Sequence, residues 1–154
     1  MKPIDYKNNT LFIEMSSKDL ADIKAILTDI NNINIEIIDA VTPHDHPEIT
    51  PERFADLKQQ LGKVRLDLAN RQNDQVTIVL NETSLIDLSI ILSATYSTDE
   101  PFVGEGHIAV TDEDIERIEE QVTLIGYGLK SIEQIERLEK ELNISIPRFK
   151  YAQK

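Results

Sequence analysis

His44, Asp45 and His46 are the sequence's one histidine cluster, and Glu48 follows two residues later. Imidazoles with nearby carboxylates are ligands that zinc and softer transition metals accept. A metal-dependent hydrolase built on His44 and His46 is therefore one hypothesis, with His107 as the third imidazole such a site would need. However, alternate residues of a proline-bracketed loop seldom converge on one ion. We therefore expect a solvated loop here and no bound metal.

Other catalytic signatures are missing from the sequence. The chain has no cysteine, which excludes disulfides, thiol catalysis and cysteine-based zinc sites. The glycine pairs at residues 104–106 and 126–128 lack the further glycine and lysine of a phosphate-binding loop. Asp22 and Asp87 occupy matched positions in the two halves of the chain and could form an acid–base pair. An acidic residue on an otherwise apolar helix more often caps a helix end or lies at the border with solvent. We therefore expect no enzyme and no cofactor.

The excess of acidic over basic residues is the clearest chemical feature of the sequence. The 28 acidic residues outnumber 16 basic ones, for a formal net charge of −12. Such a balance disfavours direct nucleic-acid binding, because phosphate contacts need lysine and arginine. Residues 97–120 hold nine acids and a single base, Arg117, which is a net charge of −8 in 24 residues.

Helix-dipole chemistry explains acids in the first turn of a helix, but not acids that lie further along it. Surface charge can also serve solubility alone. We nevertheless expect this cluster to bind a basic partner, through Glu105, Asp112, Glu113, Asp114, Glu116, Glu119 and Glu120.

The elements that must position these acids are predicted from apolar spacing. Alternation and β-branched runs predict strands near residues 11–14, 33–38 and 76–80, with a further short strand at residues 108–110. Apolar residues three and four apart predict helices at 18–30, from 50 to about 73, at 84–95, 111–125 and 131–142. Thr50, Thr111 and Ser131 are the expected N-caps of three of them. The expected core side chains include Phe54, Leu57, Leu61, Ile115, Ile118 and Val122.

The two halves of the chain resemble each other. Residues 10–73 and 76–145 share the order strand, helix, connection and capped helix. This order predicts an internal repeat, although amphipathic patterning alone can produce such a match. The length of 154 residues predicts a single domain, residues 1–154. The expected fold is helix-rich α+β, with a small sheet of three or four strands packed by amphipathic helices.

Together these features favour a small acidic intracellular inhibitor that binds protein. The best match by physical type is a bacterial immunity protein or antitoxin that neutralises a basic toxin enzyme. One alternative is a phage-encoded anti-defence protein that mimics DNA, and a second is the hydrolase of His44 and His46. No apolar leader or long apolar stretch is present, which favours the cytoplasm and no membrane contact. A narrow apolar seam at residues 54–68 could make a homodimer.

Overall fold

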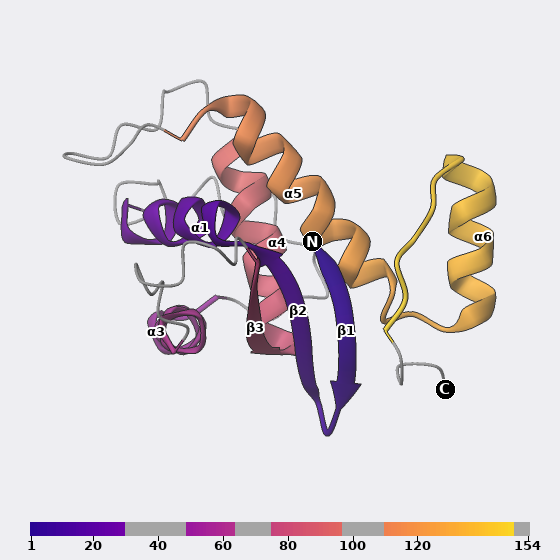
Figure 1. The fold of residues 1–154 in the computed structure, drawn as a ribbon, viewed down its shortest axis with the longest axis horizontal. Helices are drawn as coiled ribbons and strands as arrows, with labels where there is room; N and C mark the ends of the chain where they lie inside the picture. The colour runs from indigo at the N-terminus through magenta and orange to yellow at the C-terminus, as the bar shows by residue number, and fades with distance from the viewer. Residues whose placement is uncertain (30–48, 64–74, 97–109, 150–154) are drawn as a thin grey trace.

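A computed structural model describes residues 1–29, 49–63, 75–96 and 110–149. Within these ranges, three antiparallel strands form a sheet in the order β1-β2-β3, and five helices accompany it (Figure 1). The strands are β1 (Lys2–Lys7), β2 (Thr10–Ser16) and β3 (Gln75–Asn81). The helices are α1 (Ser17–Asp29), α3 (Pro51–Gly62), α4 (Glu82–Tyr96), α5 (Asp112–Tyr127) and α6 (Ile132–Leu142). The predicted class, helix-rich α+β with a small sheet, is confirmed.

The first two strands form a tight hairpin. Asn8 and Asn9 connect them with φ angles of 51° and 59°. Two consecutive residues at positive φ give the turn whose twist matches that of the flanking strands, and asparagine tolerates this conformation. Sequence patterning did not predict β1, because its residues alternate poorly and include Pro3, and because a register shift interrupts its pairing with β2 between Pro3 and Asp5.

Each of the next two strands runs directly into a helix, and the last strand residue caps that helix. The Ser16 hydroxyl at the end of β2 accepts a hydrogen bond of 3.1 Å from the Asp19 amide. Likewise, the Asn81 side chain at the end of β3 accepts one of 2.7 Å from the Ser84 amide. In both strand–helix units the helix is therefore capped by the last residue of the strand, as an internal repeat would require. The repeat itself stays a prediction.

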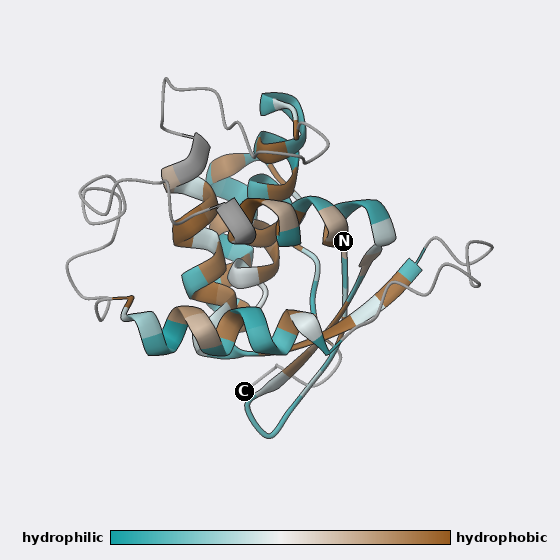
Figure 2. Cartoon of the chain, turned by 90° about the vertical axis from the view of Figure 1, so that its left-hand side faces the viewer, coloured by the Kyte–Doolittle hydropathy of each residue, from teal (hydrophilic) through white to brown (hydrophobic). Residues whose placement is uncertain are grey.

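The core lies between the sheet and the helices (Figure 2). Leu57, Leu61, Ile115, Ile118 and Val122 are at most 1% exposed, as predicted. The prediction for Phe54 was too strong, because this ring is only half-buried and Lys58 Nζ lies 4.7 Å from its centroid. Since Leu57 and Leu61 belong to the core, they are not available to the homodimer seam predicted from residues 54–68.

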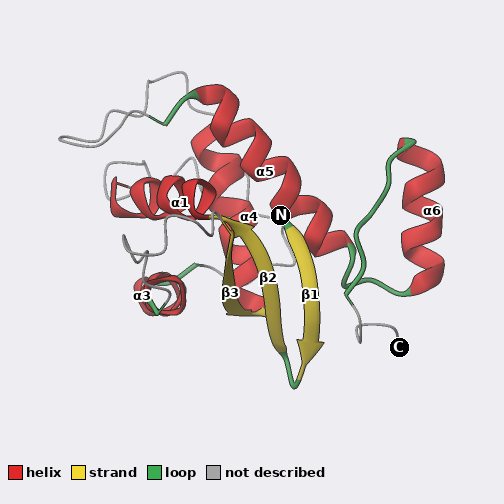
Figure 3. Cartoon of the chain, viewed as in Figure 1, coloured by secondary structure: helices red, strands yellow, loops and turns green. Residues whose placement is uncertain are grey.

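Helix α6 stands apart from the other helices, and the chain returns from it towards β1 (Figure 3). Ile135 of α6 and Ile146 of the returning segment are buried outside the main core cluster. Phe149 then enters the core, with its ring edge-on to Tyr6 at a centroid distance of 6.4 Å. A Cβ at Gly128 would overlap the Pro147 carbonyl oxygen, so the returning segment requires glycine at that position.

Several predictions fall outside the described residues. These are the strand at 33–38, the histidine loop with His44 and His46, the end of the helix beyond residue 63, and the segment holding Glu105 and His107. The predicted strand at 108–110 reaches the described part only at Val110, which is buried but is not in a strand.

Candidate partner-binding surface on helix α5

The six predicted acids that the structure describes all lie on α5. Thr111 fixes the start of this helix, because its hydroxyl accepts a hydrogen bond of 3.1 Å from the Asp114 amide. The same hydroxyl donates to Asp114 Oδ2 at 2.8 Å. Asp114 is thus part of the helix cap, in the role that its place in the first turn predicts.

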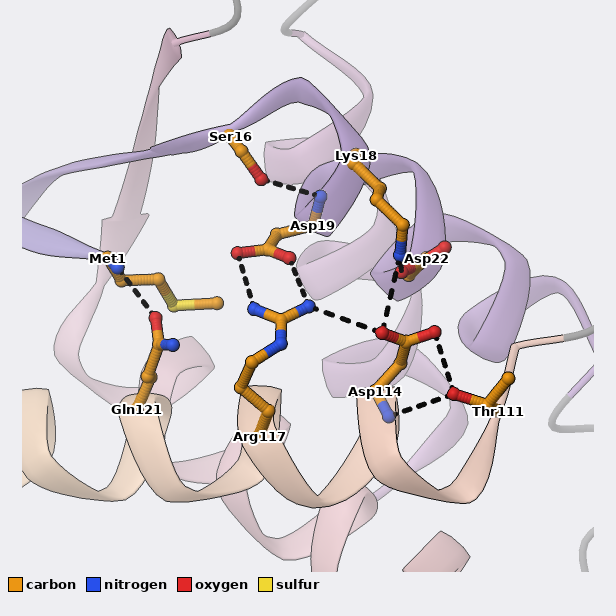
Figure 4. Close-up of polar contacts among 9 residues, drawn as sticks. All are labelled: Met1, Ser16, Lys18, Asp19, Asp22, Thr111, Asp114, Arg117 and Gln121. Atoms are coloured by element: carbon orange, nitrogen blue, oxygen red, sulfur yellow. Dashed lines mark hydrogen bonds and ion pairs between the residues drawn. The ribbon is translucent and has the colours of Figure 1, made fainter.

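A second side of α5 is held against α1 by ion pairs (Figure 4). The Arg117 guanidinium donates two hydrogen bonds to the Asp19 carboxylate, of 2.8 and 3.2 Å. Only 7% of the Asp19 side chain is exposed. Arg117 also lies 3.5 Å from Asp114, which in turn lies 3.4 Å from Lys18 Nζ. Lys18 reaches Asp22 at 2.8 Å. Five charged groups therefore form one continuous network between the two helices.

This network shifts the ionisation of its members. The pKa of the Asp114 carboxyl is lowered, first by the hydrogen bond from Thr111 and then by Lys18 and Arg117. The pKa of Lys18 is raised, chiefly by its hydrogen bond to Asp22, and the pKa of Arg117 is raised, chiefly by its hydrogen bonds to Asp19. The folded state therefore favours the charged forms of Asp114, Lys18 and Arg117.

This shift predicts an acid-dependent contribution from Asp114. A carboxyl whose pKa is lower in the folded state stabilises the fold above its unfolded pKa of about 4, and this stability is lost as the pH falls through the folded pKa. We expect the wild type to be more stable than Asp114→Asn near neutral pH, and the difference to shrink below about pH 4. Urea unfolding of both proteins at several pH values measures this. A difference that does not vary with pH would contradict the prediction.

Glu119 lies on a third side of α5, which faces α4. Its Oε1 accepts hydrogen bonds from the Ser93 hydroxyl at 3.0 Å and from the Thr123 hydroxyl at 3.2 Å. Ser89 and Thr123 lie 3.5 Å apart at the same junction. Glu119 therefore joins two helices rather than facing a partner, and the expectation that it belongs to the binding face finds no support in this geometry.

The remaining side of α5 faces solvent. Four of the predicted acids are exposed and make no ion pair with any other described residue: Asp112, Glu113, Glu116 and Glu120. Residues three and four apart lie side by side on a helix, so these carboxylates form one stripe. We call these four residues the acidic stripe.

Helix α3 shows that a threonine-capped helix with the same buried positions as α5 can form without the carboxylates of the acidic stripe. It too begins after a threonine cap, with Thr50 accepting from the Arg53 amide at 3.2 Å, and it too buries the residues seven and eleven positions after its cap. At the positions of Asp112, Glu116 and Glu120, however, α3 carries Pro51, Ala55 and Gln59. Three of the four carboxylates thus have uncharged counterparts on a helix of the same design.

The two matched acids of the chain halves do not form a catalytic pair. Asp87 is buried in a bidentate ion pair with Arg53, at 2.7 and 3.2 Å, whereas Asp22 binds Lys18.

Sequence reasoning missed the pairing of Asp19 with Arg117. The one sequence feature that could have indicated this pair is that Arg117 is the single base among the nine acids of residues 97–120.

In the described ranges, no three histidine or acidic side chains are grouped so as to hold a metal ion. None of the helices there combines the length and the apolarity needed to cross a bilayer. Comparisons with protein families, with curated proteins and with solved structures gave no match.

Proposed function

We propose that this chain is an acidic intracellular inhibitor that binds protein, of the immunity-protein or antitoxin type, and that it neutralises a basic bacterial toxin enzyme through the acidic stripe. The observation that carries the proposal is the exposure of Asp112, Glu113, Glu116 and Glu120 on the one side of α5 that packs against nothing described. The other acids of this helix, Asp114 and Glu119, are engaged within the protein.

The physical argument rests on repulsion within the stripe. Like charges three or four residues apart on a helix destabilise it by about 0.2–0.5 kcal/mol per pair. Glu116 stands in this relation to Asp112, Glu113 and Glu120. A basic surface on a partner would relieve the repulsion and would attract the stripe during encounter.

An inhibitor accounts for the shape of the stripe better than a DNA mimic does. The stripe is one helix side wide, and its acids come from α5 alone. Duplex DNA presents two lines of phosphates, about 1.7 Å of helix axis per charge when both are counted. Mimicry of a duplex would call for a second line of carboxylates beside the first.

Co-expression tests the proposal. A toxin enzyme encoded beside the gene for this chain should inhibit growth when expressed alone, and co-expression of the wild-type chain should restore growth. The Glu116→Lys/Glu120→Lys variant should protect poorly. The control is Glu136→Lys/Glu141→Lys, which makes the same change of charge at exposed positions of α6 and should protect like the wild type. Equal protection by all three proteins would refute a role for the stripe.

A further inference from the structure

The outer face of the sheet carries an aromatic side chain at a position where an antiparallel sheet usually presents polar groups to water. Alternation along β2 places Leu11, Ile13 and Met15 in the core. Phe12 lies on the opposite face, and it belongs neither to the core cluster nor to the half-buried apolar side chains packed against that cluster. In Figure 1, α4 passes behind the sheet, so the outer face is the one turned towards the viewer.

Phe12 is the middle member of a row of three residues on this face. Asp5 of β1 is directly opposite Phe12 on one side, and Val79 of β3 is directly opposite it on the other. Side chains of directly opposite residues share a face of the sheet and stand close enough to touch. Asp5 and Phe12 are half-buried, and Val79 is 38% exposed. The row therefore combines a carboxylate, an aromatic ring and an apolar side chain.

The Asp5 carboxylate lacks a hydrogen-bond donor. Its Oδ1 is shielded from solvent and accepts no hydrogen bond. In the part of the chain that the structure describes, no basic side chain forms an ion pair with Asp5. The two lysines of β1, Lys2 and Lys7, lie opposite Glu14 and Thr10 instead. A shielded carboxylate oxygen without a donor costs free energy, and a donor brought by a bound group would remove this cost.

A guanidinium group fits both the ring and the carboxylate. Its plane can stack on an aromatic ring, while N–H groups at its edge donate two parallel hydrogen bonds to a carboxylate. An ammonium group is a compact point charge without this planar fork. We propose that Asp5 and Phe12 bind the guanidinium of an arginine side chain of a partner protein, with Val79 in contact with the apolar stem of that side chain.

The shape of the surface and the charge of the chain favour a protein as the source of the guanidinium. Small free ligands bind in concave pockets that enclose most of their surface, whereas this row lies on a sheet face where Thr77 and Val79 are exposed. The net charge of −12 attracts a partner that carries arginines on its surface.

The site is separate from the acidic stripe. The core lies between the sheet and the helices, and the stripe is on the solvent side of α5, so the two surfaces are on opposite sides of the core. The proposal therefore does not depend on the proposed inhibitory function.

NMR titration of the wild-type chain with the peptide acetyl-Gly-Arg-Gly-amide tests the proposal. The amide resonances of Asp5, Phe12 and Val79 should shift as the peptide is added. A peptide with citrulline in place of arginine has nearly the same shape but no charge, and it should not shift them. A lysine peptide should bind more weakly than the arginine peptide, because its ammonium group cannot stack and donate in the same plane.

Two variants test the named side chains. Asp5→Leu should abolish the shifts at Phe12 and Val79, and it should raise the midpoint of urea unfolding because it removes the unpaired carboxylate oxygen. A carboxylate with only a structural role would lose stability when replaced. Phe12→Leu keeps an apolar side chain but removes the ring, and it should weaken binding about threefold or more. The control is Asp56→Leu at an exposed position of α3, which removes the same charge and should bind like the wild type.

Four results would overturn the proposal. They are an absence of shifts in the row, equal shifts with the arginine and citrulline peptides, shifts confined to the acidic stripe, and an Asp5→Leu variant that binds like the wild type. If Asp5→Leu does not fold, Phe12→Leu decides, and wild-type affinity of that variant contradicts the proposal. None of these results changes the outcome of the co-expression test, so failure of this site and failure of the inhibitory function are distinguishable.

Discussion

Replacement of Arg53 by alanine is expected to destabilise the fold by about 3–5 kcal/mol, because the change removes the guanidinium from a buried carboxylate. The Asp87 side chain is 1% exposed and receives two hydrogen bonds from Arg53, of 2.7 and 3.2 Å. The pair joins α3 to α4, the helix that carries much of the core. Its loss should therefore weaken the packing of both helices.

Urea unfolding measures this effect. The control is Arg137→Ala, whose ion pair with Glu133 spans 3.8 Å between side chains that are 64% and 86% exposed. Exposed pairs of this kind contribute about 0.5 kcal/mol or less. The double variant Arg53→Met/Asp87→Leu should recover most of the lost stability, because it removes both charges of the pair together. Equal effects of Arg53→Ala and Arg137→Ala would show that the buried pair has no special importance.

Charge reversal in the acidic stripe is expected to slow association with the proposed basic toxin partner by about tenfold or more at low salt. Glu116→Lys/Glu120→Lys replaces attraction by repulsion at two exposed positions of α5. Because such charges act mainly on the encounter, the association rate should change more than the dissociation rate. The difference from wild type should shrink as salt screens the charges. Stopped-flow association at two ionic strengths measures both effects.

The α6 variant Glu136→Lys/Glu141→Lys separates a local effect from one of net charge. Both variants change the charge of the molecule equally, so a general field effect would slow them equally. Only a specific role of the stripe makes the α5 variant slower than the α6 variant. If both associate at the same rate, the stripe is an ordinary solvated face and the proposed function loses its main support.

Much of the fold could be predicted, because local patterns determine it. The helical spacing of Ile115, Ile118 and Val122 and the cap at Thr111 together gave α5 within about two residues of its observed ends. Strand β1 could not be predicted in this way, since it is held by pairing with β2 and by burial of Pro3 rather than by its own pattern.

For the candidate binding surface, the sequence could predict the region of the chain but not which of its acids face solvent. The sequence shows that acids are dense on α5, but the neighbours of each side of a helix are set by tertiary packing. Asp114 and Glu119 were therefore grouped with Glu116 and Glu120, although the first two bind groups on α1 and α4. The partner of Arg117 is Asp19, nearly a hundred residues earlier, and no local spacing rule connects them.

The position of Phe149 has a consequence for synthesis of the protein. This ring is 1% exposed and belongs to the same core as Leu11 and the Tyr6 ring that it meets. A ribosome makes Phe149 138 residues after Leu11, so the growing chain exposes part of its apolar core until Phe149 has been made. Incompletely folded chains of this kind are prone to aggregate. Nascent chains of this protein should therefore depend on chaperones until residue 149 has left the ribosome.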